Sequence, residues 1–138
     1  MLANGITLGL KKKGEDTYTI LEGLKEVPEL GADPEKVDNT TLADKTKIYE
    51  LGIGDPGDLA YKFKWENEAE DSTYRTLNEI ADGSTVASFQ ETFPDGTTFT
   101  FDAQCTIKVG GGGVNAAIEF TLNLGLQSEI VVENPKAA

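Results

Sequence analysis

The fold that this chain can adopt is constrained most by the alternation of apolar and polar residues over long stretches. In residues 99–109 and 116–124 every second side chain is apolar and almost all of those between are polar or charged. Residues 59–65 repeat the pattern with Leu59, Tyr61, Phe63 and Trp65. Period two sends successive side chains to opposite faces of a strand. Each stretch therefore predicts a strand with one buried face and one wetted face, and Cys105 falls on a buried face as a small core residue.

Turn residues connect these strands. Pro94-Asp95-Gly96 separates the run 85–93 from the run 97–109, and this combination predicts a hairpin. Residues 110–113 are four consecutive glycines between two strong strand patterns. Neither a Gly-Lys-Ser/Thr sequence nor a helix pattern follows them, so they predict a flexible hairpin turn and not a phosphate-binding loop.

One helix is expected, at roughly residues 68–81. Asn67 is placed to cap its start in a capping-box pattern with Glu70, and Gly83 is placed to end it. A narrow apolar stripe should pack on the sheet and give the helix a structural role. This stripe consists of Tyr74, Leu77 and Ile80.

The sequence predicts one domain over residues 1–138, with loose termini at about 1–5 and 133–138 and a long loop at about 43–57. Residues 35–42 are a candidate strand ahead of this loop. Glycines and Pro56 disfavour regular structure in the loop, so mobility in the free subunit is expected. The segment is nevertheless rich in apolar residues, namely Leu42, Ile48, Tyr49, Leu51 and Ile53. These either dock on another chain or cover one end of the protein's own core.

Composition excludes several classes of function. The chain has no histidine, a single cysteine, and a formal net charge of −12. Without histidine the commonest general base and metal ligand are missing, so we expect no enzyme and no catalytic, cofactor-binding or metal-binding residues. The acidic excess disfavours binding to nucleic-acid phosphates or to anionic membranes. No targeting signal is recognisable, so synthesis and folding in a cytoplasm are expected.

The order of short motifs along the chain is similar to that of a known family. These motifs are residues 23–30, 34–38, 40–44 and 54–59, the aromatic strand, the capped helix, the hairpin of 90–93 with 96–99, and Gly113-Val114-Asn115 before the last long strand. Over roughly residues 20–132 this order resembles the major tail (tail tube) protein of long-tailed bacteriophages.

The resemblance implies a β-sandwich or partly closed barrel with one flanking α-helix. It implies hexameric rings that stack into a hollow tail tube, made in the cytoplasm of a bacterial host and built into the virion. It implies a loop around residues 40–58 that contacts neighbouring subunits, which agrees with the docking role considered above for the apolar residues. The implied partners are further copies of the chain and the tape-measure, tail terminator and tail-tip or baseplate proteins. The resemblance also implies that genomic DNA passes through the tube without specific binding.

The polar strand faces would suit the wetted wall of such a tube, and Asp102 and Glu119 are then expected to face the lumen. Two alternatives stay open. One is an inner-tube ring protein of a contractile injection or type VI secretion system. The other is a β-sandwich ligand-binding module, which is disfavoured because Trp65 and the phenylalanines fall on core-type faces.

Overall fold

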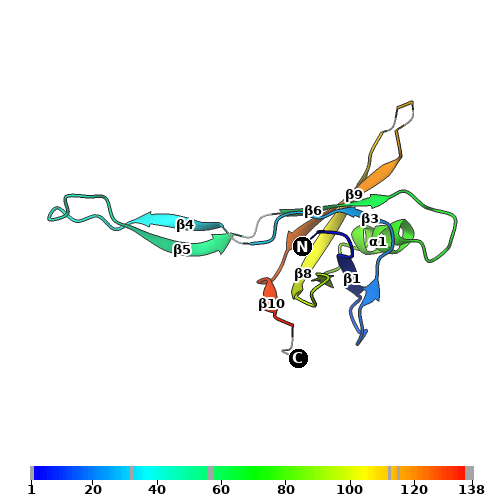
Figure 1. Ribbon diagram of the computed structural model, residues 1–138, viewed down its shortest axis with the longest axis horizontal. Coiled ribbons are helices and arrows are strands. Elements are labelled where there is room, and N and C mark those ends of the chain that lie inside the picture. The colour runs from blue at the N-terminus through cyan, green and yellow to red at the C-terminus, as the bar shows by residue number, and fades with distance from the viewer. Residues whose placement is uncertain (1, 32, 56–57, 112, 115, 136–138) are drawn as a thin grey trace.

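The computed structural model describes residues 2–31, 33–55, 58–111, 113–114 and 116–135. Most of the chain forms one antiparallel eight-stranded sheet that curls into a half-barrel around α1 (Thr73–Asp82), as Figure 1 shows. The strand order is β2-β1-β7-β8-β9-β6-β3, and β10 pairs with β8. The predicted fold class, mainly β with one flanking helix, is confirmed in its partly closed barrel form. The strands are β1 (Thr7–Lys11), β2 (Thr19–Ile20), β3 (Leu24–Glu26), β6 (Asp58–Lys64), β7 (Ala87–Thr92), β8 (Thr98–Val109), β9 (Glu119–Leu126) and β10 (Val131–Glu133).

The apolar rows of the alternating strands meet inside the half-barrel. In β6 and β9 the inward residues pair directly, and the rings of Phe63 and Phe120 stack with centroids 5.3 Å apart. Trp65 continues the row of β6 just past its end, where its ring packs 4.6 Å from that of Tyr74 on the helix. Large fully buried side chains come from five strands and α1, so the core lies between the sheet and the helix. They include Leu8, Leu10, Tyr61, Phe63, Leu77, Phe89, Phe101, Phe120, Leu122 and Leu124.

The hairpin predicted at residues 94–96 is present, and β8 and β9 also pair as a hairpin, although Gly112 of the turn predicted there lies outside the described residues. Between β7 and β8 the amide of Phe93 donates to the Thr97 carbonyl at 2.9 Å, and Gly96 has a φ of 97°, which glycine adopts without strain. Between β8 and β9 the amide of Gly110 donates to the Glu119 carbonyl at 2.9 Å. β9 starts at Glu119, three residues later than the expected start of its strand at Ala116, and its pairing with β8 ends where Val109 faces Phe120.

The helix begins later than predicted. Its N-cap is Ser72, whose hydroxyl accepts a hydrogen bond from the Arg75 amide at 3.4 Å. Gly83 ends the helix, and its amide donates a hydrogen bond to the Glu79 carbonyl. The prediction of Asn67 as the cap was wrong. The Asn67 side-chain carbonyl accepts from Arg75 Nε at 2.6 Å, and a turn without helical hydrogen bonding occupies the residues in between.

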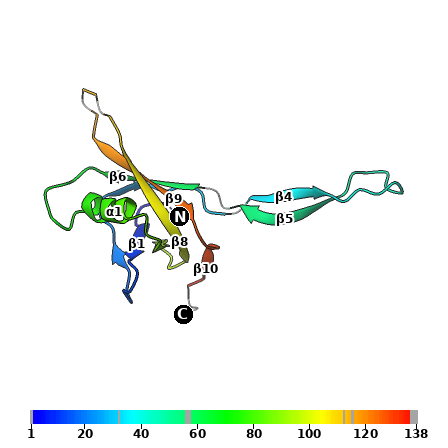
Figure 2. The ribbon, with the colours of Figure 1, turned by 180° about the vertical axis from the view of Figure 1, so that it is seen from behind.

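A separate hairpin, the arm (residues 33–55), extends far from the body (Figures 1 and 2). It consists of β4 (Asp33–Asp38), β5 (Tyr49–Asp55) and the loop between them. The prediction of a loop throughout 43–57 was wrong for β5, because residues 49–55 hydrogen-bond to β4. Residues 56–57 lie outside the described part of the chain. At the C-terminus Glu133 is the last residue of β10, and residues 136–138 are not described.

Candidate interaction surfaces

The arm has apolar side chains that are exposed in the described part of the chain. Of the five predicted contact residues, Leu42 is fully exposed, Leu51 is 71% exposed and Tyr49 is 51% exposed. Ile48 and Val37 are also exposed, and the side chain of Ile53 lies outside the described residues. A two-stranded hairpin has no further strand or helix packed against either face, so it is marginally stable by itself in water. The exposed apolar side chains of the arm are therefore typical of a segment that binds another molecule.

Hydrogen bonds shape the tip of the arm. The amide of Asn39 donates to the Ile48 carbonyl at 2.8 Å, and the amide of Ile48 donates to the Thr40 hydroxyl at 2.9 Å. The Asp44 carboxylate accepts from the amide of Thr41 at 2.8 Å. Hydrogen bonding from Thr40 lowers the pKa of Asp38 below its ordinary value. These hydrogen bonds pair backbone groups of the tip with side chains and with each other. They therefore hold the tip in a defined geometry.

The outer, polar face of the half-barrel is a second candidate surface. Asp102 and Glu119, the residues predicted to face a lumen, both lie on it, at opposite ends. Asp102 is eight positions along β8 from Gly110, the partner of Glu119, which corresponds to about 26 Å. Asp102 accepts a hydrogen bond from the Ser88 hydroxyl at 2.6 Å, and its amide donates to the Ser128 hydroxyl at 2.8 Å.

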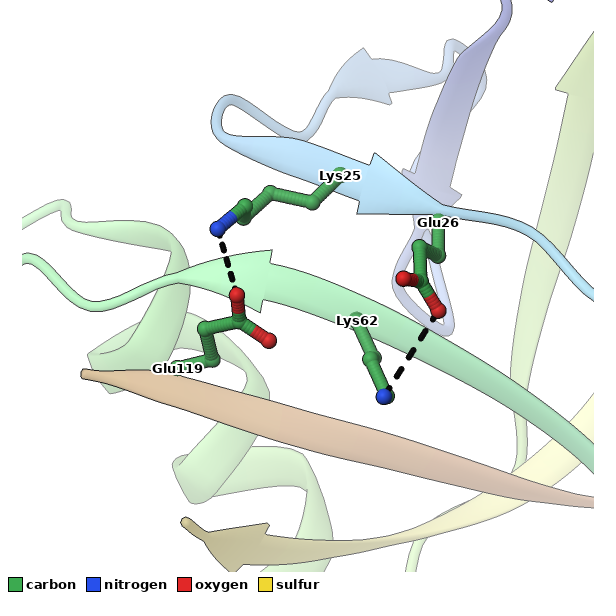
Figure 3. Close-up of polar contacts among 4 residues, drawn as sticks. All are labelled: Lys25, Glu26, Lys62 and Glu119. Carbon is green, nitrogen blue, oxygen red and sulfur yellow. Dashed lines mark hydrogen bonds and ion pairs between the residues drawn. The ribbon is translucent and has the colours of Figure 1, made fainter. Parts of the chain in front are cut away.

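Glu119 belongs to a group of four charged residues on three adjacent strands, shown in Figure 3. Its carboxylate binds the Lys25 ammonium, and Lys62 lies 3.6 Å from the carboxylate of Glu26. The hydrogen bond from Lys25 lowers the pKa of Glu119 below its ordinary value. Two ammonium groups and two carboxylates make this part of the face electrically balanced. Sequence analysis missed this group, because the alternation that placed Lys62 on the polar face does not reveal that β3 lies beside β6.

One carboxyl group lies inside the core. Glu91 of β7 is 1% exposed, and it points into the half-barrel with Phe89 and Ala87 from alternate positions of its strand. Burial raises the pKa of Glu91 above its ordinary value. Burial is also the main cause of the raised pKa of Tyr61, with the Glu91 charge second. Among the described residues neither the Glu91 Oε1 atom nor the Tyr61 hydroxyl has a hydrogen-bond partner.

The described part of the chain was also searched for metal-ligand sets, membrane-spanning helices and a reactive cysteine. No three histidine, cysteine, aspartate or glutamate side chains gather there as a metal-ligand set. No helix in these residues is long and apolar enough to cross a membrane. Cys105 is buried, its sulfur lies 3.8 Å from the Leu77 carbonyl, and burial raises its pKa to about 11. A thiol of this kind stays protonated near neutral pH and packs as a core residue.

The fold is of the phage-tail type. A chain from the cryo-EM structure of the anti-feeding prophage baseplate, 6-fold symmetrised, aligns with a TM-score of 0.78 and 11% identity over 96% of this chain and 95% of that chain. A chain from the tail of an empty GTA particle, refined helically with C6 symmetry, aligns with a TM-score of 0.75 and 19% identity over 96% and 100%. At the level of sequence, no protein family and no curated protein matches this chain.

Proposed function

We propose that this protein is a structural component of a phage-tail-like assembly, in which copies join into rings that stack as a tube. The supporting observation is the likeness of fold, which extends over nearly the full length of chains from two sixfold assemblies. Hexameric rings and passage of a genome through the tube are part of this proposal. The tape-measure, tail terminator and tail-tip or baseplate proteins are its proposed partners, and the tail of a virion is its proposed location.

Two other functions are candidates, and the structure supports one of them better than the other. A tube ring of a contractile injection system is the second candidate, because one similar fold comes from the baseplate of the anti-feeding prophage. A ligand-binding module of the aromatic-platform kind is disfavoured. Phe63, Phe89 and Phe120 are completely buried, where their rings are out of reach of a ligand.

The arm supplies the contact between neighbouring subunits in this proposal. Removing residues 36–51 and joining the ends with an Asn-Gly turn keeps the base of the hairpin and deletes the exposed apolar residues. We expect a folded monomer that no longer assembles, because none of the arm side chains that the structure describes belongs to the buried core. Sedimentation of concentrated protein measures assembly, and circular dichroism with thermal unfolding measures the fold.

Two valines provide a matched comparison for the shortened arm. Val37 on the arm and Val132 on β10 are 49% and 52% exposed. Val37→Ser is expected to weaken assembly and Val132→Ser to leave it unchanged. Full assembly of the shortened protein would contradict the assigned role of the arm.

The outer face of the half-barrel lines the tube in this proposal, so Asp102 and Glu119 face the lumen. Asp102→Lys combined with Glu119→Lys is expected to leave assembly intact and to slow DNA release, because basic groups attract phosphates that carboxylates repel. The measurement is the rate of genome release from tails that carry both changes. Exchanging the charges of one pair, with Glu119→Lys and Lys25→Glu, provides a control of unchanged net charge. Normal release from the doubly substituted tails would place these residues away from the lumen.

A further inference from the structure

On one side of the half-barrel, the two ends of the curled sheet face each other across a groove. One wall is residues 3–6, which lead into β1, and the other is residues 24–27, which are β3 and the residue after it. The groove has a volume of about 480 Å³, and we call it the seam groove. In the described part of the chain β1 and β3 do not pair with each other, so side-chain packing and not a ladder of hydrogen bonds closes this side.

A short segment before β3 ties the two ends of the sheet together beside the seam groove. The amide of Leu21 donates to the Leu8 carbonyl at 2.8 Å, and the amide of Lys64 donates to the Gly23 carbonyl at 2.7 Å. β3 itself has three residues and a register shift within its pairing with β6. The two walls can therefore separate with the loss of few hydrogen bonds.

Two buried polar groups lie behind the seam groove. Glu91 of β7 is 1% exposed and Tyr61 of β6 is completely buried. Among the described residues neither the Glu91 Oε1 atom nor the Tyr61 hydroxyl has a hydrogen-bond partner. Burial and, second, the charge of Glu91 raise the pKa of Tyr61, so the two side chains lie close together although β8 and β9 separate their strands in the sheet. They therefore meet across the interior of the half-barrel.

Strand pairing puts both groups next to the walls of the seam groove. Glu91 pairs with Leu8 of β1, and Ile6 lies two positions before Leu8, about 7 Å along the chain. On the other wall, continuation of the antiparallel pairing of β3 with β6 brings Val27 opposite Tyr61. Elsewhere hydrogen-bonded strands and α1 enclose the interior. Separation of the two walls is therefore the route that brings water to Glu91 with the smallest change in strand pairing.

Glu91 is the only charged side chain among the buried residues that the structure describes. The other titratable groups that face the interior are the thiol of Cys105 on β8 and the phenol of Tyr74 on α1. Lys25 and Glu26 at the seam groove form ion pairs with residues of the outer face (Figure 3). No cation in the described interior therefore compensates an ionised Glu91.

Ionisation of Glu91 changes the balance between a closed and an open seam. A carboxylate in an apolar interior lacks the hydration that contact with water supplies. Burial raises the pKa of Glu91 in the closed protein above its ordinary value of 4.5. Below that value the closed state keeps its full stability. As pH rises toward the raised pKa, the open state releases a proton that the closed state keeps, so opening becomes easier.

We infer that the seam between β1 and β3 is a proton-controlled joint, which is closed over Glu91 when this side chain is protonated and opens to water when it is ionised. The inference concerns a single subunit and goes beyond the proposed function. β3 is the last strand before the arm, so opening of the joint also loosens the strand that holds the base of the arm.

Exchange of amide hydrogens, followed residue by residue by NMR, tests the inference. The probes are the amides of Leu21 and Lys64, whose hydrogen bonds tie the seam. Between about pH 5 and pH 8, after correction for the intrinsic pH dependence of exchange, we expect their protection to fall about tenfold or more in the native protein. In Glu91→Gln, which keeps the shape and removes the charge, their protection is expected to stay constant.

Two sets of amides in the same spectra are controls. The amide of Asn39 donates to the Ile48 carbonyl at the tip of the arm, away from the body, and is expected to have equal protection in both proteins. The amides of Leu122 and Leu124 in the centre of the sheet exchange when the whole domain unfolds. They are expected to be better protected than the seam probes at every pH.

Tyr61→Phe provides a second measurement. The Tyr61 hydroxyl favours the ionised form of Glu91 and so opposes the larger rise in pKa that burial causes. Without this hydroxyl, the fall in protection of the seam probes is expected to extend to higher pH, because the closed protein holds the proton of Glu91 longer. Equal loss of protection at low and high pH would give Tyr61 a packing role alone and count against the joint.

Equal protection of Leu21 and Lys64 in the native protein and in Glu91→Gln at high pH would overturn the inference. Exchange of these two amides at the same rate as that of Leu122 would also overturn it, because Glu91 would then meet water only when the whole domain unfolds. Either result leaves the proposed function standing, since assembly is measured separately by sedimentation.

Discussion

Replacing Glu91 with glutamine is expected to stabilise the protein at neutral and alkaline pH and to flatten the dependence of its stability on pH. The side chain of Glu91 is 1% exposed, and its Oε1 atom has no hydrogen-bond partner among the described residues. An ionised carboxylate in this apolar site lacks the hydration that it has in the unfolded chain. Glutamine keeps nearly the same shape, carries no charge at any pH, and has an amide that can reach toward the Tyr61 hydroxyl.

The sign of the pH effect follows from the raised pKa of Glu91 in the folded protein. Below its ordinary value of 4.5 the group is protonated in both states, so its full contribution to stability is present. As pH rises toward the folded-state pKa, the unfolded chain releases a proton that the folded chain keeps, and stability falls. At higher pH the loss is complete, and a buried group of this kind costs about 1–3 kcal/mol.

Urea unfolding at several pH values between 4 and 9 measures this effect on the scale of about 1.4 kcal/mol for each unit of pKa shift. The control is Glu133→Gln, which removes an equal charge from an exposed position on β10. The native protein and Glu133→Gln should show parallel curves, with Glu91→Gln flatter than both. A Glu91→Gln curve parallel to the native one would mean that Glu91 is not a buried acid in solution.

Replacing Leu77 with alanine is expected to lower the free energy of unfolding by about 2–5 kcal/mol. Leu77 is completely buried in the core between α1 and the sheet, together with Ile80 of the same helix. Tyr74, the third residue of the stripe, is partly buried and packs against Trp65 and Phe120. Removing the leucine side chain leaves a cavity that the surrounding strands cannot close without losing their own contacts.

Chemical denaturation of Leu77→Ala and of Glu79→Ala gives the comparison, because Glu79 is exposed on the same helix. Glu79→Ala is expected to change stability by under about 0.5 kcal/mol. If Leu77→Ala lowers the free energy of unfolding by less than about 0.5 kcal/mol, the stripe is not part of the core and a partner covers it instead.

Features that depend on neighbours in the chain could be predicted from the sequence. Period-two alternation identified the buried faces of β6, β8 and β9, because the geometry of a strand assigns a face to each side chain whatever lies beside it. Pro94-Asp95-Gly96 identified the turn between β7 and β8, because φ preferences are local. The same reasoning put Leu77 and Ile80 on one side of a helix.

The start of the helix and the nature of the arm depend on contacts that are distant or hard to rank in the sequence. Asn67 and Ser72 are both good caps. Two contacts favour the later start: the hydroxyl of Thr73 donates to the Glu22 carbonyl at 2.9 Å, and Arg75 holds Asn67 outside the helix. The glycines of residues 49–55 disfavour a strand locally, yet five of these seven residues pair with residues of β4.

The sequence by itself therefore determined which residues face inward or outward in the longest strands, and only the tertiary structure decided which strands lie side by side. Lys25 and Glu119 are 94 positions apart and meet because β3 and β9 both flank β6. Glu91 takes an inward position that its polarity argues against, because its pairing with Phe99 of β8 and Leu8 of β1 sets the register of the whole strand. A register shift of one residue would turn Phe89 outward, so the burial of Ala87 and Phe89 decides where the single carboxyl group of the strand lies.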